Sequence, residues 1–186
     1  MIEFEFDQKT VQQVEKKLGD MKSKTPQVMK DALNKTAKQA RTDLRRKAQE
    51  TYTVKAGKFN KAMTIKNATT GNLTAIIKTT GQPLPISNFK TSMSKSAGGK
   101  AQVLAAGGLK SLQKGNIKAF KSTVGAGHAG MFQRKGQARL PIKQFYSNSI
   151  PVMIGNEKRV YGIVEPKIRD HLKKNIEGQI SRVLGG

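Results

Sequence analysis

The chain has 186 residues and a formal charge of +23 at neutral pH, with 35 lysines and arginines against 12 aspartates and glutamates. It contains no cysteine, which excludes a disulfide framework and a cysteine-based metal site. The length predicts a single domain over residues 1–186, and the charge favours polyanionic or acidic partners.

The amino-terminal residues predict a short strand followed by a helix. Residues 2–6 alternate apolar and charged side chains, which is the pattern of a half-buried strand. Asp7 is expected to cap a helix that Gly19 ends, and we interpret residues 1–24 as an extension of the domain. We find neither a signal peptide nor an apolar run of about 20 residues, so we expect synthesis in a cytoplasm and no membrane partner.

The clearest helix signal begins at Thr25-Pro26, a capping hydroxyl followed by proline at the first helical position. Apolar or small side chains then recur along one helical face, namely Met29, Leu33, Thr36, Ala37, Ala40, Leu44 and Ala48. The opposite face is rich in lysine and arginine, which we interpret as an ordinary solvated face. A long helix packed against the core follows from this pattern.

Residues 53–89 predict a short helix and a hairpin. Thr53 is expected to cap a helix over residues 55–61. Two β-branched, alternating runs at 63–67 and 73–79 flank a turn-forming segment, which favours a hairpin. Residues 84–89 are expected to be extended, because each proline restrains itself and the residue before it.

Residues 90–127 are rich in glycine, serine, alanine and lysine. Strands are expected at 101–105 and 117–123, and the remainder is interpreted as a long mobile loop that becomes ordered on assembly. The lysines of this loop are candidates for contact with DNA or with an acidic partner: Lys95, Lys100, Lys110, Lys114, Lys118 and Lys121.

The stretch from His128 to Asn156 combines arginines, aromatic residues and prolines, and it has no acidic residue. It predicts a strand at 131–134, an extended segment at 140–142 and a helical turn from Ile150. We expect this stretch to join the sheet to a closing helix over residues 158–184, with a break near Gly162 and Pro166.

The predicted elements amount to an α+β fold. Long amino-terminal and carboxy-terminal helices flank a small antiparallel β-sheet, and a long loop rich in glycine and lysine is inserted.

No aspartate or glutamate occurs between Glu50 and Glu157, a span that holds sixteen lysines and arginines. A solvated face normally mixes both signs of charge, so the span predicts a surface that meets negative charge. A flexible, lysine-rich region is the alternative.

The same span has no carboxylates that could act as a pair in acid–base catalysis, and neither His128 nor His171 has an evident partner. We therefore expect no enzyme, no catalytic residue, no cofactor and no metal.

Four motifs of the central stretch carry a family resemblance: Phe132-Gln133-Arg134, Arg139-Leu140-Pro141-Ile142, Phe145-Tyr146 and Ser149-Ile150-Pro151. Together they resemble the signature of the minor tail protein Z family, the tail-completion proteins of long-tailed bacteriophages and their prophages. The chain departs from this signature at Ser147-Asn148, where the family tends to have Gly-Pro, and in the length of the 90–127 segment.

The resemblance implies a structural protein of the virion, made in the cytoplasm of the bacterial host, that completes the tail and joins it to the head. Its implied partners are the tail terminator, the tail tube and the connector. A homo-oligomer, for which a ring is one arrangement, and contact with packaged DNA are further expectations. The candidate partner-binding residues are Arg134, Arg139, Leu140, Pro141, Ile142, Phe145 and Tyr146. For Leu140, Ile142 and Phe145, packing in the core is the alternative.

The competing hypothesis is a non-specific, nucleoid-type DNA-binding protein. It rests on the net charge alone, because base-stacking aromatics are sparse and no nucleic-acid-binding motif is visible. Such a protein would bind duplex DNA with a steep salt dependence.

Limited proteolysis checks the predicted loop. Trypsin is expected to cut the free protein first between Lys90 and Gly127, because a mobile, lysine-rich segment offers accessible cleavage sites. Mass spectrometry of the first fragments locates the cut. Early cleavage elsewhere, with residues 90–127 left intact, contradicts the prediction.

Overall fold

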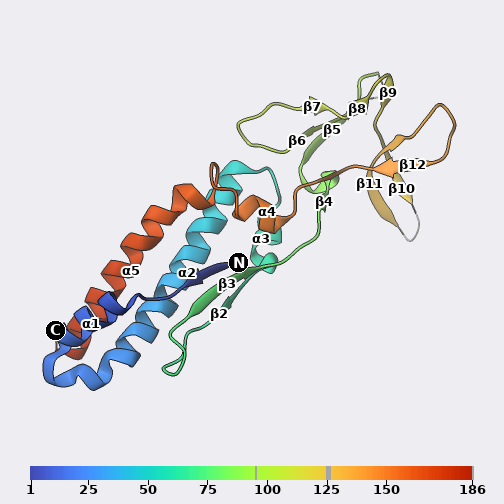
Figure 1. Cartoon of the computed structure of the whole chain (residues 1–186). Helices are drawn as coiled ribbons and strands as arrows, with labels where there is room; N and C mark the ends of the chain where they lie inside the picture. The colour runs from blue at the N-terminus through green and yellow to red at the C-terminus, as the bar shows by residue number, and fades with distance from the viewer. Residues whose placement is uncertain (95, 125–126, 186) are drawn as a thin grey trace.

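The computed structural model describes residues 1–94, 96–124 and 127–185. The molecule is elongated, with helices gathered at one end and short strands at the other (Figure 1). We call residues 84–147, from β4 to β13, the distal lobe, and the remaining residues the helical body.

The helices are α1 (Gln8–Leu18), α2 (Thr25–Thr51), α3 (Ala56–Ala62), α4 (Ile150–Ile154) and α5 (Tyr161–Val183), with 3-10 helices η1 (Gly19–Lys24) and η2 (Ile86–Asn88). The strands of the helical body are β1 (Ile2–Phe4), β2 (Met63–Lys66) and β3 (Ala75–Thr79). Those of the distal lobe are β4 (Leu84–Pro85), β5 (Lys90–Ser94), β6 (Gly98–Gln102), β7 (Lys110–Ser111), β8 (Gln113–Lys114), β9 (Ile117–Lys118), β10 (Phe120–Val124), β11 (His128–Arg134), β12 (Ile142–Gln144) and β13 (Tyr146–Ser147).

The first helix has the ends that the sequence predicts, whereas the second begins differently. Asp7 caps α1 by accepting a hydrogen bond from the Thr10 backbone N–H at 2.8 Å, and hydrogen bonding to the side chain and then the backbone of Thr10 lowers the pKa of Asp7. Gly19 closes α1 with a φ of 53°. The predicted cap at Thr25 is wrong, because η1 runs directly into α2 and gives Thr25 helical backbone angles. Its buried hydroxyl has no hydrogen-bond partner among the described residues.

Helices α2 and α5 lie along each other and form the framework of the helical body (Figure 1). All seven residues of the predicted apolar stripe on α2 are buried. Leu33 and Ala37 share a cluster with Leu172 of α5, and Ile180 of α5 packs with Val28 in a second cluster. Burial of each large aliphatic side chain contributes roughly 1.5–3 kcal/mol, so this contact is a major source of stability.

Helix α5 is continuous, so the predicted break near Gly162 and Pro166 is wrong. A proline inside a helix removes one backbone hydrogen bond, here the bond to the Gly162 carbonyl. Val164 and Ile168, on either side of Pro166, are both buried in the main hydrophobic cluster. Their packing holds the turns of α5 together despite the missing bond.

A buried amide fixes the register of α2 against α5. The Asn175 side chain, 4% exposed, donates to Thr36 Oγ1 at 2.9 Å and to Gln39 Oε1 at 2.7 Å. An amide buried without these partners would be costly, so sliding one helix along the other is disfavoured.

An ion cluster lies one turn away in the same contact. The buried Asp43 of α2 accepts a hydrogen bond from Lys167 Nζ at 2.9 Å, and its other carboxylate oxygen lies 2.9 Å from His171 Nε2. Burial raises the pKa of Asp43, but the hydrogen bonds from Lys167 and His171 outweigh this effect and leave the pKa below its ordinary value. His171, which has no evident partner in the sequence, is therefore part of a bridge between the helices.

The predicted hairpin forms and packs on α2. Strands β2 and β3 pair antiparallel, and β1 adds to the free side of β3 with Ile2 opposite Ile77. Asn34 of α2 donates to the Ala68 carbonyl at 3.0 Å and accepts from the Ala68 N–H at 2.7 Å. This two-way bond ties the end of the hairpin to the long helix.

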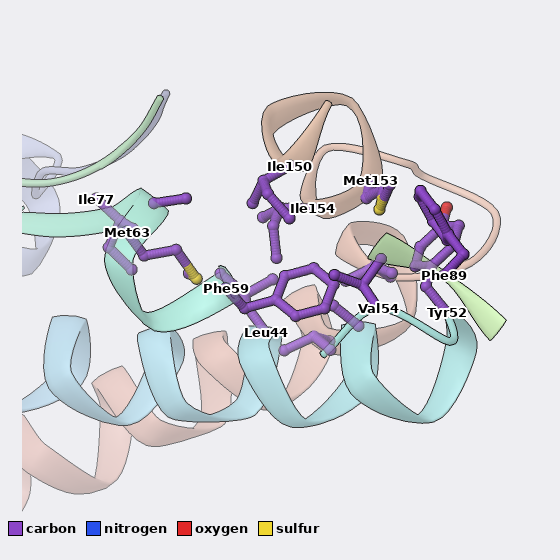
Figure 2. Close-up of a cluster of buried hydrophobic side chains, with 14 of the residues drawn as sticks. Leu44, Tyr52, Val54, Phe59, Met63, Ile77, Phe89, Ile150, Met153 and Ile154 are labelled. Carbon is purple, nitrogen blue, oxygen red and sulfur yellow. The ribbon is translucent and has the colours of Figure 1, made fainter. Parts of the chain in front are cut away.

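The main hydrophobic cluster lies at the end of α2, where α3 and α4 cover it (Figure 2). Phe59 of α3 is fully buried near Leu44 of α2, with Ile154 of α4 on the other side of the ring. The cluster continues toward the distal lobe through Phe89, Ala101 and Met131. The predicted helical turn from Ile150 thus exists as α4 and fills the core.

Thr53 does not cap the short helix that the sequence predicts after it. Its hydroxyl instead donates to the Gln102 carbonyl and accepts from the Lys90 N–H at 3.1 Å. Its backbone N–H donates to the Val103 carbonyl at 3.0 Å. These bonds connect the helical body to β5 and β6 of the distal lobe, while α3 begins without a side-chain cap.

Several small antiparallel sheets stand where the sequence predicts one. Those of the distal lobe have the strand orders β5-β6-β7, β8-β9, β10-β11-β12 and β13-β4. The segment predicted to be extended, 84–89, is a strand only at β4 and then turns into η2.

The prediction of a long loop rich in glycine and lysine is also wrong with respect to secondary structure. Most described residues between 90 and 127 lie in strands β5 to β10, which include parts of both predicted strands. A Cβ on Gly99 would lie 2.2 Å from Met131 Cε and 3.2 Å from the Ala119 side chain. This glycine therefore permits a close approach between strands, a role that composition does not distinguish from that of a glycine in a loop.

Replacing Asp43 tests the ion cluster. The Asp43→Asn variant is expected to lose about 1–3 kcal/mol of unfolding free energy at neutral pH, because Lys167 and His171 lose their acceptor. Since the folded pKa of Asp43 is lowered, its contribution is fully present above the ordinary pKa of 3.8 and is lost progressively as the pH falls from there through the folded pKa.

Urea unfolding at neutral pH and at about pH 3 measures this difference between the wild type and Asp43→Asn. Glu165→Gln is the control, because the Glu165–Arg169 pair is exposed and such pairs contribute less than about 1 kcal/mol. An Asp43→Asn effect that is equal at both pH values contradicts the assignment.

Candidate functional site: a basic groove on the distal lobe

A groove of about 880 Å³ opens on the distal lobe, beside strands β9, β11, β12 and β13. We call it the basic groove, and its lining consists of Gly115, Ile117, Gln133, Arg134, Lys135, Lys143, Gln144, Phe145 and Tyr146. Every one of these residues belongs to the span that has no aspartate or glutamate.

The charge of the groove is uncompensated. Arg134, Lys135 and Lys143 are all exposed, and no described carboxylate lies within ion-pair distance of them. The whole distal lobe holds eleven lysines and arginines and no acidic residue. Since the lobe cannot neutralise these cations itself, the groove presents a positive potential to whatever approaches it.

The remaining lining is aromatic and amide-bearing. Tyr146 is 55% exposed, and its hydroxyl donates to Gln144 Oε1 at 2.9 Å. Phe145 is half-buried and packs against the main hydrophobic cluster. Gln133 is buried and donates to the Ile117 carbonyl, which holds β9 beside β11. The groove therefore combines cations with apolar surface that a partner can cover.

Strand pairing positions the groove residues. In the β11–β12 pair, Gln133 lies opposite Lys143 and Arg134 lies opposite Ile142. The Phe145 N–H donates to the Met131 carbonyl at 2.9 Å, so the chain stays paired to β11 beyond the end of β12. Arg134 and Lys143 are thus held on hydrogen-bonded strands, and Lys135 follows β11 directly, where its N–H donates to the Pro141 carbonyl at 3.0 Å.

The structure brings together only some of the seven residues predicted to bind a partner. Arg134, Phe145 and Tyr146 line the basic groove. Arg139, Leu140 and Pro141 lie in the exposed loop between β11 and β12, where the Leu140 side chain is 67% exposed.

Ile142 is half-buried in β12 and belongs neither to the groove lining nor to the main cluster. For Phe145 the two alternatives were core packing and partner contact. The residue packs against the core and also lines the groove, so its position agrees with both. Partner contact by any of the seven remains a prediction.

The predicted lysines are spread over the distal lobe rather than gathered at one site. Lys110, Lys118 and Lys121 are exposed in β7, β9 and β10, and Lys100 is half-buried in β6. Lys118 Nζ donates to the Ser96 carbonyl. Lys95 lies outside the described residues, and of Lys114 only the backbone is described.

Lys135 and Lys143 are groove residues that the sequence interpretation missed, as are Gln133 and Gln144. The extended segment predicted at 140–142 ends just before Lys143, and it does not say which residues of β11 lie opposite. That register depends on the β11–β12 loop, whose length alone does not fix the pairing. His128, expected in a loop, is the first residue of β11.

Other kinds of site have no support in the described residues. Within residues 1–94, 96–124 and 127–185, no three histidine, aspartate or glutamate side chains come together as a metal site. The described helices include none with the length and hydropathy needed to cross a membrane.

Comparison with known proteins adds one match. The family model described as prophage minor tail protein Z matches residues 9–185, which is nearly the whole chain. Searches of curated proteins and of solved structures found nothing that matches.

A tryptophan reporter tests whether the groove binds acidic chains. The protein has no tryptophan, so Tyr146→Trp places a single fluorophore in the groove. Adding poly-glutamate at low salt is expected to change its emission, and salt near 1 M, where the Debye length is about 3 Å, is expected to abolish the change.

Val152→Trp is the matched control, because Val152 of α4 is also 55% exposed but lies outside the distal lobe. Equal responses from the two reporters would show that the binding is not located at the groove.

Proposed function

The chain belongs to the prophage minor tail protein Z family, and we propose that it completes the tail at its head-proximal end by docking its distal lobe on acidic neighbouring proteins. Membership makes the chain a structural minor tail protein of a phage or prophage, which acts through contacts with other tail proteins. The place in the tail and the docking surface are the proposal.

The observation that carries this proposal is the separation of charge along the molecule. All twelve acidic residues lie within residues 3–50 and 157–177, which are parts of the helical body, and the distal lobe has none. Random placement on a basic protein would leave some acids in a lobe of this size. A surface of one sign is suited to a partner of the opposite sign, and it also speeds encounter.

The basic groove is the part of this surface that we assign to docking. Two of its three cations, Arg134 and Lys143, lie on paired strands, so little conformational entropy of the backbone is lost there when a partner binds. The exposed Tyr146 supplies apolar area at the same place. We propose the tail terminator, tail tube or connector as the neighbours, with packaged DNA as the alternative partner of the same cations.

Genetic complementation tests the proposal. A phage that lacks this protein is supplied with the Arg134→Glu/Lys143→Glu double variant, which reverses two groove charges. We expect the yield of infectious particles to fall by about two orders of magnitude or more, because like charges across an interface are strongly unfavourable. Electron microscopy is expected to show tails that are not joined to heads.

Lys22→Glu/Lys24→Glu is the matched control, since both lysines are exposed in η1 of the helical body. It makes the same change in net charge and is expected to leave the yield within a few-fold of wild type. If the groove variant folds and complements like this control, the groove is not the docking surface.

Titration with duplex DNA separates the two kinds of partner. A gel shift at low salt that is lost in the groove variant, with a steep dependence on salt concentration, would assign the cations to phosphate contacts. Wild-type protein that captures purified tails but does not shift DNA assigns them to protein docking.

A further inference from the structure

A second pocket lies on the helical body, away from the basic groove. It has a volume of about 290 Å³ and lies beside the amino terminus, the end of β3, α4 and the start of α5. We call it the acidic pocket, and its lining consists of Met1, Ile2, Glu3, Thr79, Pro151, Ile154, Gly155, Glu157 and Tyr161.

The side chains that line this pocket have the opposite sign to the net charge of the chain. It is lined by Glu3 and Glu157, and apart from the amino-terminal Met1 no described cationic residue lines it. Neither carboxylate has an ion-pair partner among the described residues, in a chain with 35 lysines and arginines. Burial and the charges of Glu165 and Glu157 raise the pKa of Tyr161, which agrees with a negative potential there.

The pocket is also apolar in part. The half-buried Ile2 and Pro151 contribute aliphatic surface, and Ile154 lies almost fully buried beneath it. A matching partner would therefore present one apolar side chain next to a cation. A uniformly basic surface would leave the apolar area uncovered.

The loop between β11 and β12 of the distal lobe presents such a pair. Leu140 is the most exposed large hydrophobic residue after Met1 among those described, and Arg139 beside it is exposed and has no described ion-pair partner. The loop contributes nothing to the basic groove apart from Lys135. An exposed leucine at the end of a loop is an apolar surface that association can bury.

We propose that the Arg139-Leu140 loop of one copy of this chain inserts into the acidic pocket of a second copy. Leu140 covers the aliphatic lining, and the Arg139 guanidinium pairs with Glu3 and Glu157. The loop lies at the outer end of the distal lobe (Figure 1), whereas the residues that line the pocket belong to the helical body, so the two surfaces are free to engage different copies.

Such a contact is heterologous, because two different surfaces meet. It links copies head to tail, and it either closes into a ring or continues as a filament. The charge of +23 opposes association of identical copies, so a local pairing of opposite charges is what a stable contact between them requires. The contact leaves the basic groove open. A failure of this contact would therefore not contradict the proposed function, and a failure of the proposed function would not contradict the contact.

Charge reversal in two separate variants tests this proposal. Sedimentation velocity at physiological salt is measured for wild type, Arg139→Glu and Glu157→Lys, each without an amino-terminal tag because Met1 lines the pocket. The wild type is expected to associate. Each variant alone is expected to associate at least about tenfold more weakly, because like charges then meet at the contact.

Mixing the two variants gives the deciding result. In an equimolar mixture, the loop that carries the Arg139→Glu change meets the pocket that carries the Glu157→Lys change. The unchanged loop meets the unchanged pocket, so association is expected to return. An isologous contact through one surface alone would be affected by only one of the two single variants, because the other surface takes no part in it. The Arg139→Glu/Glu157→Lys double variant is expected to associate by itself.

Lys121→Glu is the control with the same change in charge as Arg139→Glu, on an exposed strand residue outside both surfaces. It is expected to associate at least as strongly as wild type. A wild type that stays monomeric at its highest soluble concentration, or a mixture that stays dissociated, overturns the proposal.

Discussion

The contact between α2 and α5 is the constraint on which the rest of the structure depends. It joins residues more than a hundred positions apart through a seam of small and aliphatic side chains, which the Asn175 amide and the Asp43 carboxylate hold in register. Every other part of the helical body packs on this pair. The hairpin is tied to α2 through Asn34, and α3 and α4 cover the end of α2 around Phe59. The distal lobe is attached in turn through Thr53 and the main cluster.

The same framework explains where negative charge occurs. Several carboxylates of the helical body have structural roles: Asp7 caps α1, Asp43 joins the two long helices, and Glu165 pairs with Arg169 on α5. The strands of the distal lobe are held by backbone pairing and by close approaches at glycine, which need no carboxylate. The lobe can therefore be wholly basic without loss of folding, and its charge is available for a partner.

The central stretch separates into two surfaces once it is folded. Arg134, Phe145 and Tyr146 line the basic groove, whereas Arg139 and Leu140 lie exposed in the β11–β12 loop. The groove meets a neighbour of different sequence in the proposed function, and the loop meets another copy of the chain in the proposed contact. A subunit with two separate surfaces can be part of an assembly of its own kind and still bind the next component of a tail.

The sequence by itself determined the helices and the family. Spacing of apolar residues over a long helix is a repeated signal, and the caps at Asp7 and Gly19 are local, so α1, α2 and the hairpin were predictable. The four motifs of the central stretch pointed to the family that the family model matches.

Only the tertiary structure decided the strands of residues 90–127, the continuity of α5 through Pro166, and the partners of Thr53 and His171. Each of these depends on contacts between residues distant in sequence, which override local propensity. The tertiary structure also decided that Arg134 lies with Lys143 and that Glu3 lies with Glu157. Strand register and helix packing bring these residues together, and no local sequence pattern predicts it.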